Sequence, residues 1–289
     1  MKKIALVLLI SIYFSNFALG QALQAYQLFD RQGQKVDFGL LLEKSVQTQV
    51  VLFGELHNNP ISHWLQYELS RELAQRFGQN LVLGAEMFET DNQLILNEYL
   101  SGLINERNFI AEAKLWNNYA TDYKPLVELA KEKGLNFIAT NIPRRYAAIV
   151  NRKGFEGLES LSTEAKRYIA PLPPAYNPDL PGYKAMLEMS GMPAHNSENF
   201  PKAQAIKDAT MAHFIYKNLN PNGLFVHYHG TYHSNNFEGI YWYLRLANQN
   251  LRIVTISTVE QADISTLEEA SIGLADFIIA VPKTMTKTF

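Results

Sequence analysis

The stretch that decides the fold is VVLFGELHNNPISHW, residues 50–64, in which an apolar run meets an acid and two histidines. The run ending at Phe53 has strand length and no polar interruption, which is typical of a strand buried on both faces of a parallel sheet. Asn59 and Pro60 predict the start of a helix, because a capping side chain followed by proline suits its first turn.

The predicted helix carries one apolar stripe at four-residue spacing and ends at Gly78. Its members are Ile61, Leu65, Leu69, Leu73 and Phe77. His63 falls on the opposite side of the first turn, which leaves two roles open for it, a surface residue or a group that supports a site.

The same pattern returns in GLFVHYHGTYH, residues 223–233. Both apolar runs lead into Gly-x-x-His, at Gly54 to His57 and at Gly230 to His233. We expect the glycines to stand where the chain turns sharply after a strand, since glycine turns without strain.

Apolar strand patterns alternate with helical ones over most of the chain, and strand patterns are missing between residues 154 and 222. This predicts the α/β class, a mainly parallel sheet flanked by helices, as a single domain over residues 21–289. We expect residues 144–222 to form a helical insertion or cap. Further expectations are a hairpin around Gly33, a strand ending near Glu86 and a helix capped by Asp91.

In such sheets ligands bind beyond the carboxyl ends of the strands, so polar residues placed there converge on one rim. The residues predicted at this rim are Glu55, His57, Glu86, Arg144, His229 and His233. His57, His233 and Glu86 have the donor types for a divalent metal ion with open positions. Metal-bound water could then hydrolyse an amide or ester, with Glu55 or Glu86 as general base and Arg144 on the anion.

Other residues near these motifs have more ordinary explanations. His227 is expected in the core, and His195 and His213 stand in no pattern. Asp208 shares a helix face with Gln204, Met211 and Ile215, where a carboxylate needs a partner. That partner is either a nearby lysine or a rim histidine whose ring it orients, so Asp208 and His63 are the candidates for supporting roles.

Haem binding is a second possible function, because an exported protein can hold ferric haem through a tyrosine or a histidine. The candidate contacts are Tyr176, Tyr183, Tyr232 and His229. With 15 tyrosines in the chain, each one is more often a packing residue.

Composition narrows the classes of partner. The net charge is −2 and the pI about 6.4, without a basic stripe, so no nucleic-acid partner is expected. The 289 residues include no cysteine, which excludes disulfides, thiolate metal sites and a lipid anchor on cysteine.

The first twenty residues predict a secretory signal peptide. Lys2 and Lys3 precede a short apolar stretch, and small residues lead to cleavage after Gly20. We therefore expect export to the periplasm or cell surface, without a cysteine-linked anchor.

Four segments, GELHNNPISHWLQ, LVLGAEMFE, AQAIKDATMAHFI and HGTYHSNNFEGI, resemble in this order the blocks of the ChaN-like family of haem-binding uptake proteins. The family lies in a superfamily with Tiki and TraB-type proteins and erythromycin esterases. The resemblance implies a parallel α/β domain with a helical subdomain, haem bound through tyrosine at a dimer interface, and a homodimer and outer-membrane haem-uptake machinery as partners.

The Tiki-like relatives imply a different activity for the same rim. There the paired Gly-x-x-His motifs, a glutamate and an arginine form a metal-dependent peptidase site, which corresponds here to His57, Glu86, Arg144 and His233, with Glu55 beside them. The leading expectation is an exported haem-binding protein of haem or iron uptake, and the alternative is a metal-dependent hydrolase.

Overall fold

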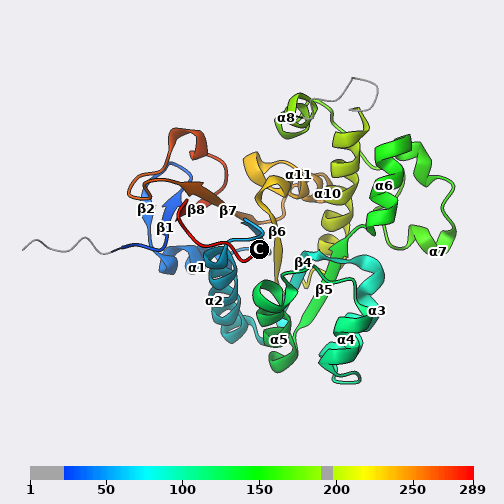
Figure 1. Ribbon diagram of the computed structural model, residues 1–289, viewed down its shortest axis with the longest axis horizontal. Helices are drawn as coiled ribbons and strands as arrows, with labels where there is room; N and C mark the ends of the chain where they lie inside the picture. Colours follow the sequence, from blue (N-terminus) through cyan, green and yellow to red (C-terminus); the bar gives the residue numbers. More distant parts are fainter. Residues whose placement is uncertain (1–22, 190–197) are drawn as a thin grey trace, which may run out of the picture.

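Eight strands form one mixed sheet in the order β2-β1-β8-β7-β3-β6-β4-β5 (Figure 1). The computed structural model describes residues 23–189 and 198–289, so the predicted signal peptide and His195 lie outside the described residues. The strands are β1 Gln27–Asp30, β2 Lys35–Val36, β3 Val50–Glu55, β4 Leu81–Glu89, β5 Asn136–Asn141, β6 Leu224–Gly230, β7 Ile253–Gln261 and β8 Phe277–Pro282.

The strands from β8 to β5 run parallel, and only the β1–β2 hairpin at one edge is antiparallel. The mainly parallel α/β sheet is thus confirmed. The helices between the strands are α1 Phe38–Val46, α2 Pro60–Phe77, α3 Gln93–Leu100, α4 Glu106–Glu112, α5 Lys124–Lys133, α6 Arg144–Lys153, α7 Thr163–Lys166, α8 Pro181–Met189, α10 Asn199–Lys217 and α11 Ile240–Ala247.

Helices cover both faces of the sheet, which gives three layers (Figure 1). Strand β3 shows why its sequence is apolar throughout. Val51 and Phe53 share a core with α2 and α5 on one face, while Val50 and Leu52 share a core with α10 and α11 on the other. Each fully buried side chain of this kind contributes about 1.5–3 kcal/mol of transfer free energy.

Helix α2 begins as its sequence predicts, because the Asn59 side chain accepts hydrogen bonds from the backbone N–H groups of Ile61 and Ser62. The expectation for α3 was wrong. Its N-cap is Asn92, and Asp91 instead forms ion pairs with Arg145 and Lys114. Strand β4 also continues to Glu89, past the expected end near Glu86.

The edge strand β5 is covered by a side chain. Gln93, at the start of α3, donates to the carbonyl of Phe137 at 2.9 Å and accepts from the N–H of Ala139 at 2.7 Å. Both backbone groups belong to β5, the strand at the edge of the sheet, and they face away from β4. The Gln93 amide therefore occupies the position that a neighbouring strand would take.

Helices and loops without strands connect β5 to β6 over the described residues of this segment, in agreement with the helical composition expected between residues 144 and 222. In the ranges 23–189 and 198–289, no helix combines the length and apolar character required to cross a membrane.

Candidate functional site

The candidate site lies where the neighbouring strands β3, β6 and β4 end. Glu55 is paired with Gly230 in the β3–β6 register, and Glu86 follows directly after the last residue of β4 that pairs with β6. His57 comes two residues after β3, and His233 lies in a short 3-10 turn, Thr231–His233, after β6. The structure therefore brings Glu55, His57, Glu86 and His233 to one rim.

Strand alternation divides this rim into two clusters on opposite faces of the sheet. The Glu55 cluster faces α2 and α5 and contains Glu55, His57, His63, Gln66, Asn118, Asp122 and Tyr123. The Glu86 cluster faces α10 and contains Glu86, Tyr183, Gln204, Asp208 and His233.

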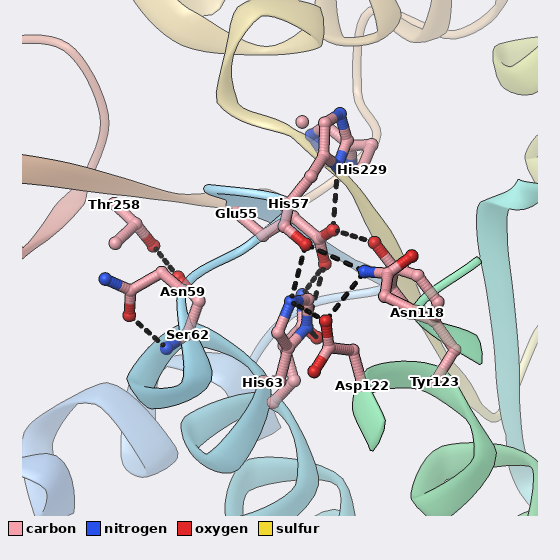
Figure 2. A network of polar contacts seen from close by, with 12 residues as sticks. Glu55, His57, Asn59, Ser62, His63, Asn118, Asp122, Tyr123, His229 and Thr258 are labelled. Atoms are coloured by element: carbon pink, nitrogen blue, oxygen red, sulfur yellow. Dashed lines mark hydrogen bonds and ion pairs between the residues drawn. The ribbon is translucent and has the colours of Figure 1, made fainter. Parts of the chain in front are cut away.

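Glu55 is buried, and both of its carboxylate oxygens are occupied (Figure 2). Oε1 accepts hydrogen bonds from His57 Nδ1 at 2.9 Å and from the Tyr123 hydroxyl at 2.7 Å. Oε2 accepts from the Gln66 amide at 2.5 Å. Because Glu55 accepts the hydrogen bond from Nδ1–H, it fixes the tautomer of His57 and directs Nε2 away from the cluster.

Glu55 and His57 shift each other's pKa in opposite directions. Burial favours the neutral form of Glu55, but the hydrogen bond from His57 and the charges of His63 and His57 leave the Glu55 pKa below its ordinary value. Burial likewise opposes the charged form of His57, yet Glu55 and Glu86 raise the His57 pKa.

A second set of contacts fixes the backbone at His57 (Figure 2). The His57 carbonyl accepts from His63 Nε2 at 3.1 Å and from the Asn118 amide at 2.9 Å. Asn118 also donates to Asp122 at 2.7 Å, and Asp122 accepts from the Thr288 hydroxyl at 2.8 Å. Of the two roles left open for His63, the surface position is wrong, since the side chain is buried.

In the Glu86 cluster the imidazole of His233 bridges two carboxylates. Nδ1 lies 2.5 Å from Asp208 Oδ1, and Nε2 lies 3.2 Å from Glu86 Oε1. The other oxygen of Asp208 accepts from the Tyr183 hydroxyl at 2.8 Å, and that of Glu86 accepts from the N–H of Gly230 at 2.9 Å. The partner of Asp208 is thus a rim histidine.

This arrangement favours a charged imidazole. Burial opposes protonation of His233, but the charges of Glu86 and Asp208 outweigh it and raise the His233 pKa to about 10. The same interaction lowers the pKa of Glu86, against the effect of its burial. His233 therefore donates from both nitrogens and stabilises two buried carboxylates.

The donor set does not fit the metal site predicted on His57, His233 and Glu86. A metal ligand needs a free nitrogen lone pair, and both nitrogens of His233 face carboxylates. Over the described residues, no group of three or more His, Cys, Asp or Glu side chains is placed to hold a metal ion.

Gly230 lies between the two clusters. A β-carbon on Gly230 would lie 2.7 Å from His57 Nε2 and 3.7 Å from Glu86 Oε2. The backbone torsion φ of Gly230 is −60°, which any residue adopts, so the expected role in a sharp turn is wrong. Gly54 is similar, because its β-carbon would lie 2.8 Å from the carbonyl oxygen of Ile256. Both positions require glycine because neighbouring atoms lie too close to leave room for a β-carbon.

Arg144 lies outside both clusters. Its side chain is exposed and lines a hollow of about 330 Å³ with Trp116, Asn118 and Phe289. Trp116 in turn contacts the His57 ring edge-on, with ring centroids 4.9 Å apart. Arg144 thus shares a hollow with Trp116, which contacts His57, but within the described part of the chain it forms no hydrogen bond or ion pair with Glu55 or Glu86.

The predicted haem contacts differ in accessibility. His229 is fully buried, with its nitrogens bonded to His227 and Ser234, and burial lowers its pKa to about 3. Tyr183 is buried against Asp208, and its pKa is raised by burial. The structure gives neither residue access to a ligand as large as haem, which corrects both expectations.

Tyr232 and Tyr176 are more accessible. Tyr232 is 41% exposed, and burial of its hydroxyl together with the charges of Glu238 and Asp208 raises its pKa to about 12. The Tyr176 ring is half-buried and stacks on the Tyr183 ring, and burial raises the Tyr176 pKa. Both phenols are therefore protonated at neutral pH.

Several site residues were not predicted from the sequence. Asn118, Asp122 and Tyr123 come from the turn around the π-helical segment Tyr119–Tyr123, which has no periodic pattern. Gln66 could have been found, because it follows His63 by three residues and so lies on the same side of α2.

Solved structures support this architecture. ChaN of Campylobacter jejuni, described as binding haem cofacially, matches with a TM-score of 0.66 at 18% identity, over 88% of this chain and 96% of that one. A mutant erythromycin esterase in its open conformation matches with a TM-score of 0.50 at 12% identity, over 92% and 99%. A Bacillus cereus protein matches with a TM-score of 0.50 at 13% identity, over 84% and 90%. These similarities concern the fold.

A comparison with curated proteins gave no match. A family model described as haem-binding uptake, Tiki superfamily, ChaN, matches residues 41–244, which include the whole of both clusters apart from the bond from Thr288 to Asp122. This match covers well over half of the sequence. The chain therefore belongs to the ChaN family of haem-binding uptake proteins in the Tiki superfamily.

Proposed function

We propose that this protein binds haem and acts in haem or iron uptake. The observation that carries the proposal is the family match over residues 41–244. The similarity of the whole fold to the Campylobacter jejuni ChaN, a protein described by its cofacial haem binding, supports it.

The residues present fit such a ligand. Protein-bound haem needs a nitrogen or oxygen ligand for the iron, apolar walls for the ring and cations for the propionates. Tyr176 and Tyr232 are partly exposed and lie beside α8, where Tyr176 stacks on Tyr183 and Tyr232 donates to the carbonyl of Gly182. When bound, haem would supply an iron centre that these side chains can ligate only after losing a proton.

Titration of the purified protein with ferric haem tests the proposal. We expect a shifted Soret band that saturates at a defined ratio of haem to protein. A spectrum that stays that of free haem in buffer, even with protein in excess, would refute haem binding. An unrelated protein of similar size and charge provides the control for unspecific association.

We also propose that the protein is exported and works as a homodimer with outer-membrane haem-uptake machinery. The basic and apolar start of the sequence supports export. The mature chain recovered from cells should then begin at Gln21, and haem should shift the protein to twice its mass in sedimentation experiments. A chain that keeps residues 1–20 in the cytoplasmic fraction would contradict export.

Hydrolysis of an ester or amide is a second candidate function. It is favoured by the Glu55–His57 pair, because His57 is partly exposed and its Nε2 has no hydrogen-bond partner among the described residues. Nε2 could accept a proton from water as the water oxygen attacks a carbonyl carbon. His57 Nε2 would then donate that proton to the leaving oxygen or nitrogen as the bond between the carbonyl carbon and the leaving atom breaks.

Activity against simple aryl esters and peptides, with and without chelator, tests this second candidate. His57→Ala should abolish hydrolysis, and Glu55→Gln should reduce it by about 10²–10⁴-fold through loss of the oriented tautomer. Arg71→Ala, on the surface of α2, is the matched control and should keep full activity. Equal rates for the wild type and His57→Ala would exclude this function for the cluster.

A further inference from the structure

A hollow lined by cations lies at the end of the sheet opposite the candidate site. Its volume is about 520 Å³, and its lining comes from the end of α1, the end of α11 and the start of β7. Ile253 lines this hollow and is paired with Val50, the first residue of β3, the strand that ends at Glu55. The two ends of β3 are roughly 17 Å apart, so the hollow and the candidate site are separate places.

Three basic side chains line this hollow, those of Lys44, Arg245 and Arg252. Of the described residues in the lining, none is acidic, and within residues 23–189 and 198–289 these three cations form no ion pair with a carboxylate. Glu43, the neighbour of Lys44, accepts a hydrogen bond from the Gln47 amide at 3.2 Å and is not part of the lining. Three like charges around one space repel each other, and an anion in that space removes this cost.

Hydrogen bonds to the backbone hold both guanidinium groups in place. Arg245 Nη1 donates to the carbonyls of Gln249 at 2.5 Å and of Leu251 at 2.9 Å. Arg252 Nε donates to the carbonyl of Gln47 at 3.0 Å. Because these side chains are already ordered, they lose little further freedom when they bind a ligand.

The remaining N–H groups of the two arginines form two forks. The fork of Arg245 consists of Nε and Nη2, and that of Arg252 consists of Nη1 and Nη2. Neither fork donates a hydrogen bond to any described residue. Two neighbouring N–H groups of a guanidinium match two oxygens of one anion, and Lys44 adds a third positive charge.

The number of cations selects the class of anion. A carboxylate has one charge and two oxygens, which a single arginine satisfies. A phosphoryl group carries a charge of about −1.5 to −2 and presents three oxygens, so it engages both forks and Lys44. The volume of about 520 Å³ lies within the range of about 300–1,000 Å³ that is usual for small-molecule sites.

We propose that this hollow is a binding site for a phosphoryl group, which the forks of Arg245 and Arg252 hold and Lys44 pairs. The group belongs either to a free phosphorylated molecule or to a lipid headgroup, and the chemistry of recognition is the same for both. The inference goes beyond the proposed function and does not depend on it, because the hollow shares no residue with the Glu55 or Glu86 cluster.

Calorimetric titration with inorganic phosphate at low ionic strength tests the free molecule as the source. We expect saturable binding to the wild type and an affinity at least about tenfold lower for Lys44→Ala, Arg245→Ala and Arg252→Ala. Arg76→Ala removes the same charge at an exposed position of α2 and should bind within about twofold of the wild type. Lys44→Ala removes no side-chain hydrogen bond of the described chain, so its effect does not reflect a loss of the fold.

Two further measurements identify the chemistry and the source of the group. Acetate should bind at least about tenfold more weakly than phosphate, since one carboxylate leaves two of the cations unpaired. Sedimentation with vesicles of phosphatidylglycerol tests the lipid headgroup, with phosphatidylcholine vesicles as the control. Capture by the anionic vesicles that the three variants lose, without binding of free phosphate, assigns the group to a lipid.

Two results would overturn the inference. The first is that the three variants bind phosphate and anionic vesicles as the wild type does. The second is that the wild type binds neither of these probes more tightly than its control, acetate or phosphatidylcholine. Either result refutes the phosphoryl site and leaves haem binding and hydrolysis untouched, because those functions are measured on other residues.

Discussion

At the scale of the residue, the site depends on a missing side chain at Gly230. The two clusters lie on opposite faces of the sheet, and they approach each other only where His57 passes over the Gly230 backbone. Any side chain here would enter the space that His57 Nε2 occupies. A glycine at this position thus sets how close a base on one face comes to a carboxylate on the other.

Gly230→Ala should displace the His57 ring and destabilise the protein by about 1–3 kcal/mol, the usual cost of overpacking. The measurement is urea unfolding, together with NMR of the His57 ring. In a His57→Ala background the obstacle is absent, so the same glycine substitution should then cost much less. Equal costs in both backgrounds would show that the contact with His57 is unimportant.

The charged imidazole of His233 makes the free energy of unfolding depend on pH in the alkaline range. Its folded-state pKa of about 10 exceeds the ordinary value of 6.5, so its contribution to stability is complete below pH 6.5 and is lost as pH rises towards 10. The free energy of unfolding should fall above pH 7 by up to about 1.4 kcal/mol per pH unit. Urea unfolding between pH 6 and 9.5 should show this slope, and His233→Gln should flatten it.

At the scale of the element, α2 and α10 each supply one face of the rim. Helix α2 directs His63 and Gln66 to the Glu55 cluster, and α10 directs Gln204 and Asp208 to the Glu86 cluster. Each helix starts beside the strand ends, so its first half lies at the site. The position of these starts therefore determines the geometry of both clusters.

The cap of α2 provides a test. Asn59→Ala removes the oxygen that accepts from the N–H groups of Ile61 and Ser62 and should cost about 1 kcal/mol of stability. Thermal unfolding measures this cost. Asn59→Ser retains a capping oxygen and should lose less than half as much, and a serine variant as unstable as the alanine variant would contradict the capping role.

At the scale of the whole molecule, the sequence predicted the sheet and the convergence of its rim, because apolar runs in parallel strands must end at one edge. The strands leading into His57 and His233 are examples. It could not predict Tyr123 or Asp122, which reach the rim through an irregular turn. It also misplaced Asp91, since a distant partner, Arg145, decides the position of that side chain.

Haem should stabilise the folded protein as a whole if it binds only the native state. At free haem one hundred times above the dissociation constant, the free energy of unfolding should rise by about 2.7 kcal/mol. Chemical denaturation followed by far-UV circular dichroism of the backbone measures this change without relying on tryptophan fluorescence, which haem quenches. An unrelated protein of similar size and charge should gain no stability at the same haem concentration, and an equal gain there would show unspecific association.

The Gln93 amide on the edge of β5 bears on how the molecule behaves at high concentration. An uncovered strand of this length can template the addition of a foreign strand, and a single side chain blocks that addition here. Gln93→Ala should keep the fold yet form oligomers that bind thioflavin on prolonged incubation, whereas Asn108→Ala, at an exposed position of α4, should not. One glutamine thus guards this open margin of the molecule against self-association.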